Sequence, residues 1–162
     1  MADYLGDFVP DYIENQEPRE VILKLGHLVT NRIPYKLGLK KLTKYDPEYW
    51  GLAALLTDEM AEVALKMGLR TPRTLDDMVK LTGMEREPLE KLLDEMSYSG
   101  VVEYNWENPE HKKQWVLPMF VPGSAEFSNM NAKILEQHPE MGRFFERMSR
   151  LPLEAVSAMV PP

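Results

Sequence analysis

The sequence predicts an α+β fold that is mostly helical. Several segments repeat apolar residues every three or four positions, which is typical of amphipathic helices. Two short segments rich in Val, Tyr and Trp stand on either side of a polar loop, which is typical of a β-hairpin. The hydrophobic fraction of 44% and the charged fraction of 28% match a globular protein. A chain of 162 residues can hold one core with a helical extension at each end.

Residues 1–48 are predicted to form an acidic arm, a helix and a basic connector. The arm, over the first twenty residues, is rich in carboxylates. An apolar stripe from Val21 to Val29 then predicts a helix, which we expect Pro34 to end. No Asp or Glu occurs between Val21 and Tyr45. The connector therefore holds a candidate basic patch, made of Arg32, Lys36, Lys40, Lys41 and Lys44. Such a run is more often a solvated face, or a partner for the acidic arm, than a nucleic-acid site.

Residues 49–120 are predicted to form capped helices followed by the hairpin. Asp46 and Pro47 open a short helix, Thr57 caps a second that stops at Gly68, and Thr74 with Asp77 forms a capping box for a third. The clearest amphipathic stripe lies in a helix over residues 85–99. The segments VVEYNW and QWVLPMF then supply two strands around the loop ENPEHKK.

This order of helices and hairpin is typical of a winged helix, with the helix over residues 85–99 where a recognition helix would lie. The fold prediction is thus a winged-helix-like domain over residues 49–120. We expect residues 121–162 to form a C-terminal helical extension, with helices over 132–137 and from 139 to about 151. We also expect the chain to be truncated from a longer protein.

Large apolar side chains supply candidate interface residues. Trp106 and Trp115 flank the hairpin loop, and we expect them to pair across it rather than to anchor a partner. The last predicted helix adds three apolar candidates, which are Phe144, Phe145 and Met148. The faces over residues 21–29 and 144–151 could pair two copies, so a homodimer is one expected assembly.

The sequence offers no candidate for catalysis, cofactor binding or metal binding. Without cysteine it can form no disulfide, thiolate nucleophile or cysteine-ligated cluster, and it has no GxGxxG, GxxxxGKS or GxSxG pattern. His27, His111 and His138 lie in three different predicted elements, which argues against a metal site. No apolar run approaches the roughly 20 residues that span a bilayer, so we expect a cytoplasmic protein with no membrane partner.

Charge argues against nucleic acid as the partner. The formal net charge is −7, and the helix over residues 85–99 carries five carboxylates against Arg86 and Lys91. Phosphates would be repelled from this helix, so we favour a winged helix that docks protein over one that reads DNA. A winged-helix transcription regulator remains the alternative.

Three stretches resemble the amino-terminal region of a family of large oxidoreductases from anaerobic bacteria. They are IPYKLGLKKLTKYDPEYWGLAALLTDEMAEVALKMGLR, EYNWENPEHKKQWVLPMFVPGSAEF and HPEMGRFFERMSRLPLEAVSAMVPP. The family is that of the flavin and iron-sulfur pyridine nucleotide-disulfide oxidoreductases related to the glutamate synthase small subunit. The resemblance implies a parent protein that holds FAD, NAD(P) and 4Fe-4S clusters in domains outside this sequence. It implies for this region a non-catalytic role, docking a partner or organising the other domains, and it assigns no catalytic residue.

Overall fold

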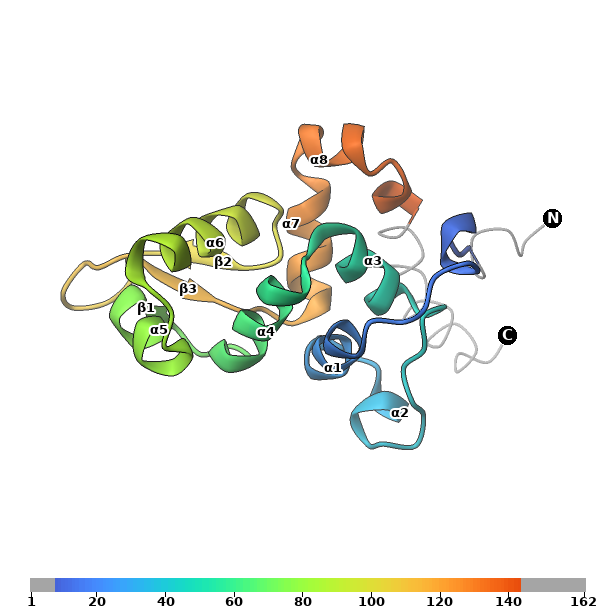
Figure 1. Ribbon diagram of the computed structural model, residues 1–162, viewed down its shortest axis with the longest axis horizontal. Coiled ribbons are helices and arrows are strands. Elements are labelled where there is room, and N and C mark those ends of the chain that lie inside the picture. Colours follow the sequence, from blue (N-terminus) through green and yellow to red (C-terminus); the bar gives the residue numbers. More distant parts are fainter. Residues whose placement is uncertain (1–7, 144–162) are drawn as a thin grey trace, which may run out of the picture.

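The computed structural model describes residues 8–143 and confirms the α+β class (Figure 1). The helices are α1 (Glu20–Val29), α2 (Ile33–Lys36), α3 (Pro47–Leu55), α4 (Asp58–Met67), α5 (Leu75–Thr82), α6 (Arg86–Tyr98), α7 (Ala125–Asn129) and α8 (Ala132–Gln137). The strands are β1 (Arg73–Thr74), β2 (Glu103–Asn105) and β3 (Gln114–Val116). Helices α4 to α6 and the sheet make one end of the molecule, while α1 and α3 lie beside them and α2 projects outward (Figure 1).

The segment before α1 lies against the body of the protein. A 3₁₀ turn, η1 (Asp11–Ile13), buries Ile13 completely. The Phe8 ring meets the Trp50 ring edge-on, with 5.6 Å between the ring centroids. The Arg19 guanidinium donates hydrogen bonds of 2.9–3.0 Å to the carbonyls of Ala53 and Leu56, which lie at the end of α3 and have no partner within that helix. The start of α1 is therefore fixed to the end of α3.

Helix α1 ends at Val29, five residues before Pro34. Its C-cap is Thr30, which has extended backbone angles. Pro34 lies instead in the first turn of α2, so the prediction that it ends the preceding helix is wrong. A proline is well tolerated there because the first turn needs no backbone N–H donor.

Local capping fixes the ends of α4 and α5 as the sequence predicts. The Thr57 hydroxyl accepts a hydrogen bond from the backbone N–H of Met60. Thr74 and Asp77 form the reciprocal capping box, which lowers the pKa of Asp77 because its carboxylate accepts the backbone N–H of Thr74. Gly83 ends α5 in the left-handed conformation.

The sheet is antiparallel, with the strand order β1-β3-β2. The hairpin of β2 and β3 confirms the prediction, although both strands are shorter than expected. The sequence did not predict β1, a two-residue strand that pairs Arg73 with Trp115. In β2, Tyr104 lies opposite Trp115, so the predicted pairing of Trp106 with Trp115 is wrong.

The chain is helical directly after the hairpin, before the first helix that the sequence predicts in the C-terminal extension. A π-helical turn, η2 (Phe120–Ser124), leads into α7. This part is held against the start of the hairpin, because the Ser124 hydroxyl donates to the carbonyl of Val101 at 2.8 Å. Helix α8 confirms the helix predicted over 132–137. The apolar face expected from 144 to 151 lies outside the described residues.

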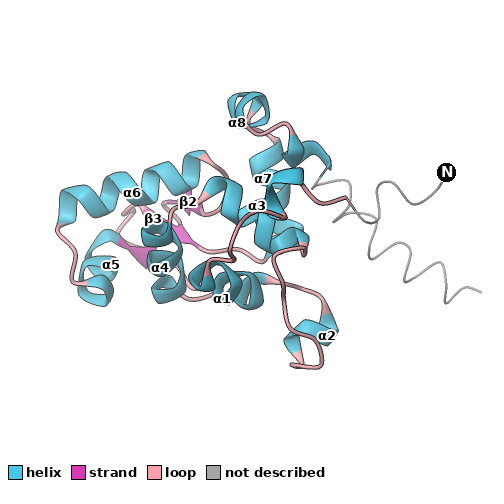
Figure 2. Ribbon diagram, turned by 45° about the vertical axis from the view of Figure 1, so that its right-hand side comes forward, coloured by secondary structure: helices cyan, strands magenta, loops and turns pink. Residues whose placement is uncertain are grey.

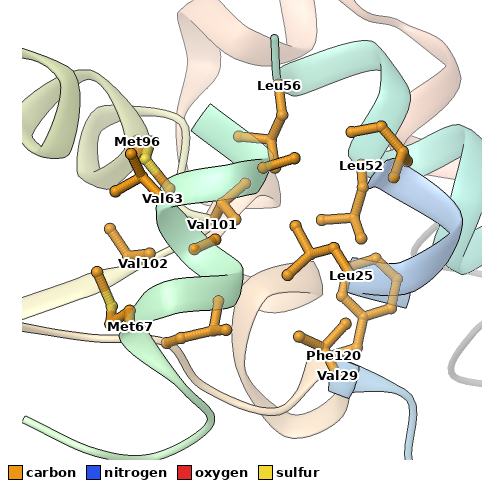
Figure 3. Packing of buried hydrophobic residues seen from close by; sticks show 14 of the residues in the cluster. Leu25, Val29, Leu52, Leu56, Val63, Met67, Met96, Val101, Val102 and Phe120 are labelled. Carbon is orange, nitrogen blue, oxygen red and sulfur yellow. The ribbon is translucent and has the colours of Figure 1, made fainter. Parts of the chain in front are cut away.

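One hydrophobic core connects both ends of the described molecule. Figure 3 shows α1, α3 and α4 meeting side chains from α6, η2 and the segment before β2. Leu25 and Met96, from α1 and α6, are fully buried in it. Among residues 8–143, no helix is long and apolar enough to cross a membrane.

Candidate functional site

The outward side of α6 is acidic, as its sequence predicts. Leu89, Leu93 and Met96 are buried beneath the helix. Since residues three and four apart share a helix face, the opposite side is left to charged residues. They line a shallow depression that ends at Tyr98, and they are Glu87, Glu90, Lys91, Asp94 and Glu95.

Arg86 at the start of this helix and two lysines of the neighbouring hairpin are paired with carboxylates. Arg86 forms an ion pair with Asp76 of α5, which lowers the pKa of that carboxyl through a hydrogen bond and its positive charge. Lys113 of the hairpin bonds to Asp94 at 2.6 Å. Lys112 pairs with Glu110 inside the hairpin loop. The positive charges at the hairpin tip are therefore partly matched within the protein.

Three exposed aromatic rings lie at the end of the acidic helix and on the neighbouring hairpin. Tyr98 is 55% exposed, Tyr104 50% and Trp106 51%. Tyr104 and Trp106 share one face of β2 and its continuation, and their rings meet edge-on at 5.6 Å. The Lys113 ammonium, which bonds to Asp94 of α6, lies 4.8 Å from the centre of the Tyr104 ring. Lys113 thus joins the aromatic hairpin to the acidic helix.

We call this region the acidic–aromatic surface. It consists of Glu87, Glu90, Asp94, Glu95, Tyr98, Tyr104 and Trp106. Large exposed aromatic side chains are common anchors in protein interfaces, where they bury much area at a small entropy cost.

The structure separates the predicted interface residues. Trp106 is half exposed and belongs to the acidic–aromatic surface, whereas Trp115 is completely buried in the core. Phe144, Phe145 and Met148 lie outside the described residues. Sequence reasoning did not select Tyr98 or Tyr104. The period-two alternation of the strand places Tyr104 on the same face as Trp106, so this signal could have found it.

The structure also divides the predicted basic patch. Arg32 is not a free cation, because its guanidinium forms a bidentate pair with Glu48 at 2.6 Å and reaches Asp46 at 2.7 Å. Lys44 donates to the carbonyls of Glu14 and Gln16 at 3.0 Å. The remaining members are exposed on the segment around α2, and they are Lys36, Lys40 and Lys41.

The Arg32 network is an ion-pair network that lies largely buried between α1, α2 and α3. Glu48 is completely buried, and the Thr30 hydroxyl donates to it at 2.8 Å. Burial alone would raise the pKa of Asp46, but hydrogen bonds from Arg32 and from the backbone of Thr43 outweigh it and lower the pKa. Burial disfavours the charged form of Arg32, yet its two carboxylate partners raise its pKa. The network fixes the ends of α1 and α2 to α3.

The described residues do not fit the cofactors that the resemblance implies for a parent protein. No group of three His, Asp or Glu side chains in residues 8–143 could hold a metal ion, and the sequence has no cysteine for a cluster. The small antiparallel sheet also lacks the parallel strands and glycine-rich turn at which dinucleotides bind.

Comparisons of the chain with protein-family models, with curated proteins and with solved structures gave no match.

Proposed function

We propose that this chain is a non-catalytic docking domain, in which a winged-helix-like unit binds a protein partner through the acidic–aromatic surface. The order α4, β1, α5, α6, β2, β3 and the sheet order β1-β3-β2 support a winged helix, with α6 as its third helix. Following the family resemblance, the partner is another domain of a larger FAD, NAD(P) and 4Fe-4S oxidoreductase, or a protein that this enzyme engages.

The observation that carries the proposal is the pairing of an acidic third helix with exposed aromatic rings. A helix that reads DNA needs positive charges facing the phosphates. The depression on the exposed side of α6 is lined instead by four carboxylates and one cation, Lys91. A protein partner with a basic surface would be attracted to that side. Trp106 and Tyr104 would then supply the apolar contact area.

The first test is the reading frame that follows Pro162 in the gene. A frame that continues into CxxC and GxGxxG motifs supports a parent oxidoreductase, whereas an immediate stop codon overturns that part of the proposal. The downstream segment, expressed as a separate chain, is then titrated with this protein by calorimetry.

Variants of the surface test where that partner binds. Trp106→Ala is expected to weaken binding by about 2 kcal/mol, or roughly 30-fold, as for an interface anchor. Leu81→Ala, at a leucine of α5 that is 41% exposed, is the matched control and should leave affinity unchanged. Glu87→Lys should slow association, while Glu62→Lys on the exposed side of α4 should not. Equal effects of target and control variants would overturn the assignment of the surface.

The transcription-regulator alternative rests on the same order of elements. It is tested by a mobility-shift titration of the chain with DNA fragments at low salt. Tight and sequence-selective binding would replace the docking proposal with the regulator.

A further inference from the structure

The segment that contains α2 presents apolar side chains to solvent. Ile33 is 68% exposed, Leu37 68% and Leu39 76%, which are high values for large aliphatic residues. Gly38 makes the turn between the two leucines with a positive φ of 70°. Both views show α2 projecting from the body, away from α6 and the sheet (Figures 1 and 2). We call residues 31–42 the α2 loop.

Three lysines accompany these aliphatic side chains. Lys36, Lys40 and Lys41 are exposed, and the loop itself contains no carboxylate. The nearest following acid is Asp46, which Arg32, Thr43 and Tyr35 already engage. The tip of the loop is therefore both cationic and apolar.

The base of the loop is firmly held. Arg32 is fixed by Glu48, and its guanidinium lies 4.0 Å from the centre of the Tyr35 ring. At the other end Leu42 is buried, and its backbone N–H donates to Nε2 of His27 at 3.1 Å. A loop fixed at both ends can hold its tip outward at a small further cost in conformational entropy.

We propose that the α2 loop is a membrane-contact site that places Ile33, Leu37 and Leu39 in the interface of an anionic lipid bilayer. Lys36, Lys40 and Lys41 would then lie among the lipid head groups. Such contact needs an apolar surface with flanking cations, and no spanning segment. It therefore differs from the sequence-based expectation of no membrane partner, which rested on the lack of a spanning segment.

The composition of the loop favours lipid over other anionic partners. Protein interfaces are enriched in aromatic residues and Arg and depleted in Lys, but here the free cations are all Lys and the exposed apolar residues are all aliphatic. Single-stranded nucleic acid is bound by stacking bases on aromatic rings, but the aromatic ring of this loop, Tyr35, already has the Arg32 guanidinium over one face. This inference does not depend on the proposed docking role of α6.

Vesicle co-sedimentation tests the proposal on the full chain. We expect binding to vesicles of phosphatidylcholine with phosphatidylglycerol, and much weaker binding to phosphatidylcholine alone. Each lysine near an anionic surface strengthens binding by about 5-fold. The variant Lys36→Gln/Lys40→Gln/Lys41→Gln should therefore have a vesicle partition coefficient that is roughly 100-fold lower. The control Lys66→Gln/Lys80→Gln/Lys91→Gln removes the same charge from exposed positions of α4, α5 and α6 and should keep binding.

A second variant separates insertion from electrostatic adsorption. Ile33→Ser/Leu37→Ser/Leu39→Ser should lose at least ~10-fold, because it removes the apolar area. The absence of cysteine allows a further readout. Leu39→Cys labelled with a polarity-sensitive dye should shift to the blue on anionic vesicles, while Leu81→Cys with the same label should not.

Four results would overturn the proposal. The first is that the chain does not bind the anionic vesicles, and the second is that the control lysine variant loses as much binding as the loop variant. The third is that the Ile33→Ser/Leu37→Ser/Leu39→Ser variant binds vesicles as well as the parent chain. The fourth is that the loop binds an RNA oligonucleotide while the chain does not partition into vesicles. Trp106→Ala should bind vesicles like the unchanged chain, so failure here and failure of the docking proposal are distinguishable.

Discussion

Removal of Arg32 is expected to be far more destabilising than removal of a similar arginine on the surface. Arg32→Ala removes the cation that pairs with the completely buried carboxylate of Glu48, which keeps the hydrogen bond from the Thr30 hydroxyl, and it also takes one cation from Asp46. Breaking a buried ion pair from one side costs about 3–5 kcal/mol, because the partner charge stays buried and uncompensated. We therefore expect a loss of about 3–5 kcal/mol in the free energy of unfolding.

Arg86→Ala is the matched control. Arg86 also pairs with an aspartate, but 60% of its side chain and 50% of the Asp76 side chain are exposed. An exposed pair of this kind contributes about 0–1 kcal/mol. Urea unfolding followed by far-ultraviolet circular dichroism measures both variants and the parent chain under one condition.

Glu48→Gln supplies an internal check on the cause. Added to Arg32→Ala, it removes the unpaired buried charge while its amide oxygen can still accept the Thr30 hydroxyl. The double variant should therefore be more stable than Arg32→Ala alone. The reasoning is refuted if Arg32→Ala costs no more than Arg86→Ala, or if Glu48→Gln brings no recovery.

Two further predictions concern a close backbone approach and pH. At Gly100, φ is +83° and an added Cβ would lie 2.4 Å from the backbone nitrogen of Ser128, whereas Gly83 has a φ of +70° and open space around it. Gly83→Ala should lower the free energy of unfolding by about 1–2 kcal/mol, because alanine is strained in the left-handed conformation. Gly100→Ala should lower it clearly more in the same urea assay, because its Cβ would also clash with α7. Equal losses for the two variants would contradict the close approach of α7. The pKa of Asp46 is lowered in the folded state, so its stabilisation should be complete above the unfolded value of about 3.9 and disappear as the pH falls through the folded value. The stability gap between the parent chain and Asp46→Asn should thus shrink on acidification from pH 6 to 3, and a constant gap would exclude this contribution.

Features determined by neighbouring residues were predictable from the sequence. The cap at Thr57, the capping box at Thr74 and the stop at Gly83 each depend on a few consecutive residues, and all three are present. The apolar stripe of α6 follows from helical spacing and correctly placed Leu89 in the core. Acidic residues on the other side of α6 were predictable for the same reason.

Features determined by distant partners were not predictable from local patterns. Strand β1 has two residues and exists because β3 lies beside it. Arg32 looked like a free cation because its partner Glu48 is sixteen positions away and becomes buried only when α3 packs on α1. The Pro122–Gly123 pair is typical of a turn, yet the packing of Ser124 against Val101 holds this stretch helical. The exposure of the α2 loop likewise required the fold.

The two proposed surfaces can act in one molecule because they lie at opposite ends of it. The α2 loop projects from one end and α6 lies at the other in both views (Figures 1 and 2). A net charge of −7 would repel most of the chain from an anionic bilayer, so contact would be favoured only with the lysine-bearing loop toward the lipid. That orientation keeps Glu87 and Glu90 away from the head groups and leaves the acidic–aromatic surface open to a basic partner. The same asymmetry of charge would thus direct one end to lipid and the other to protein.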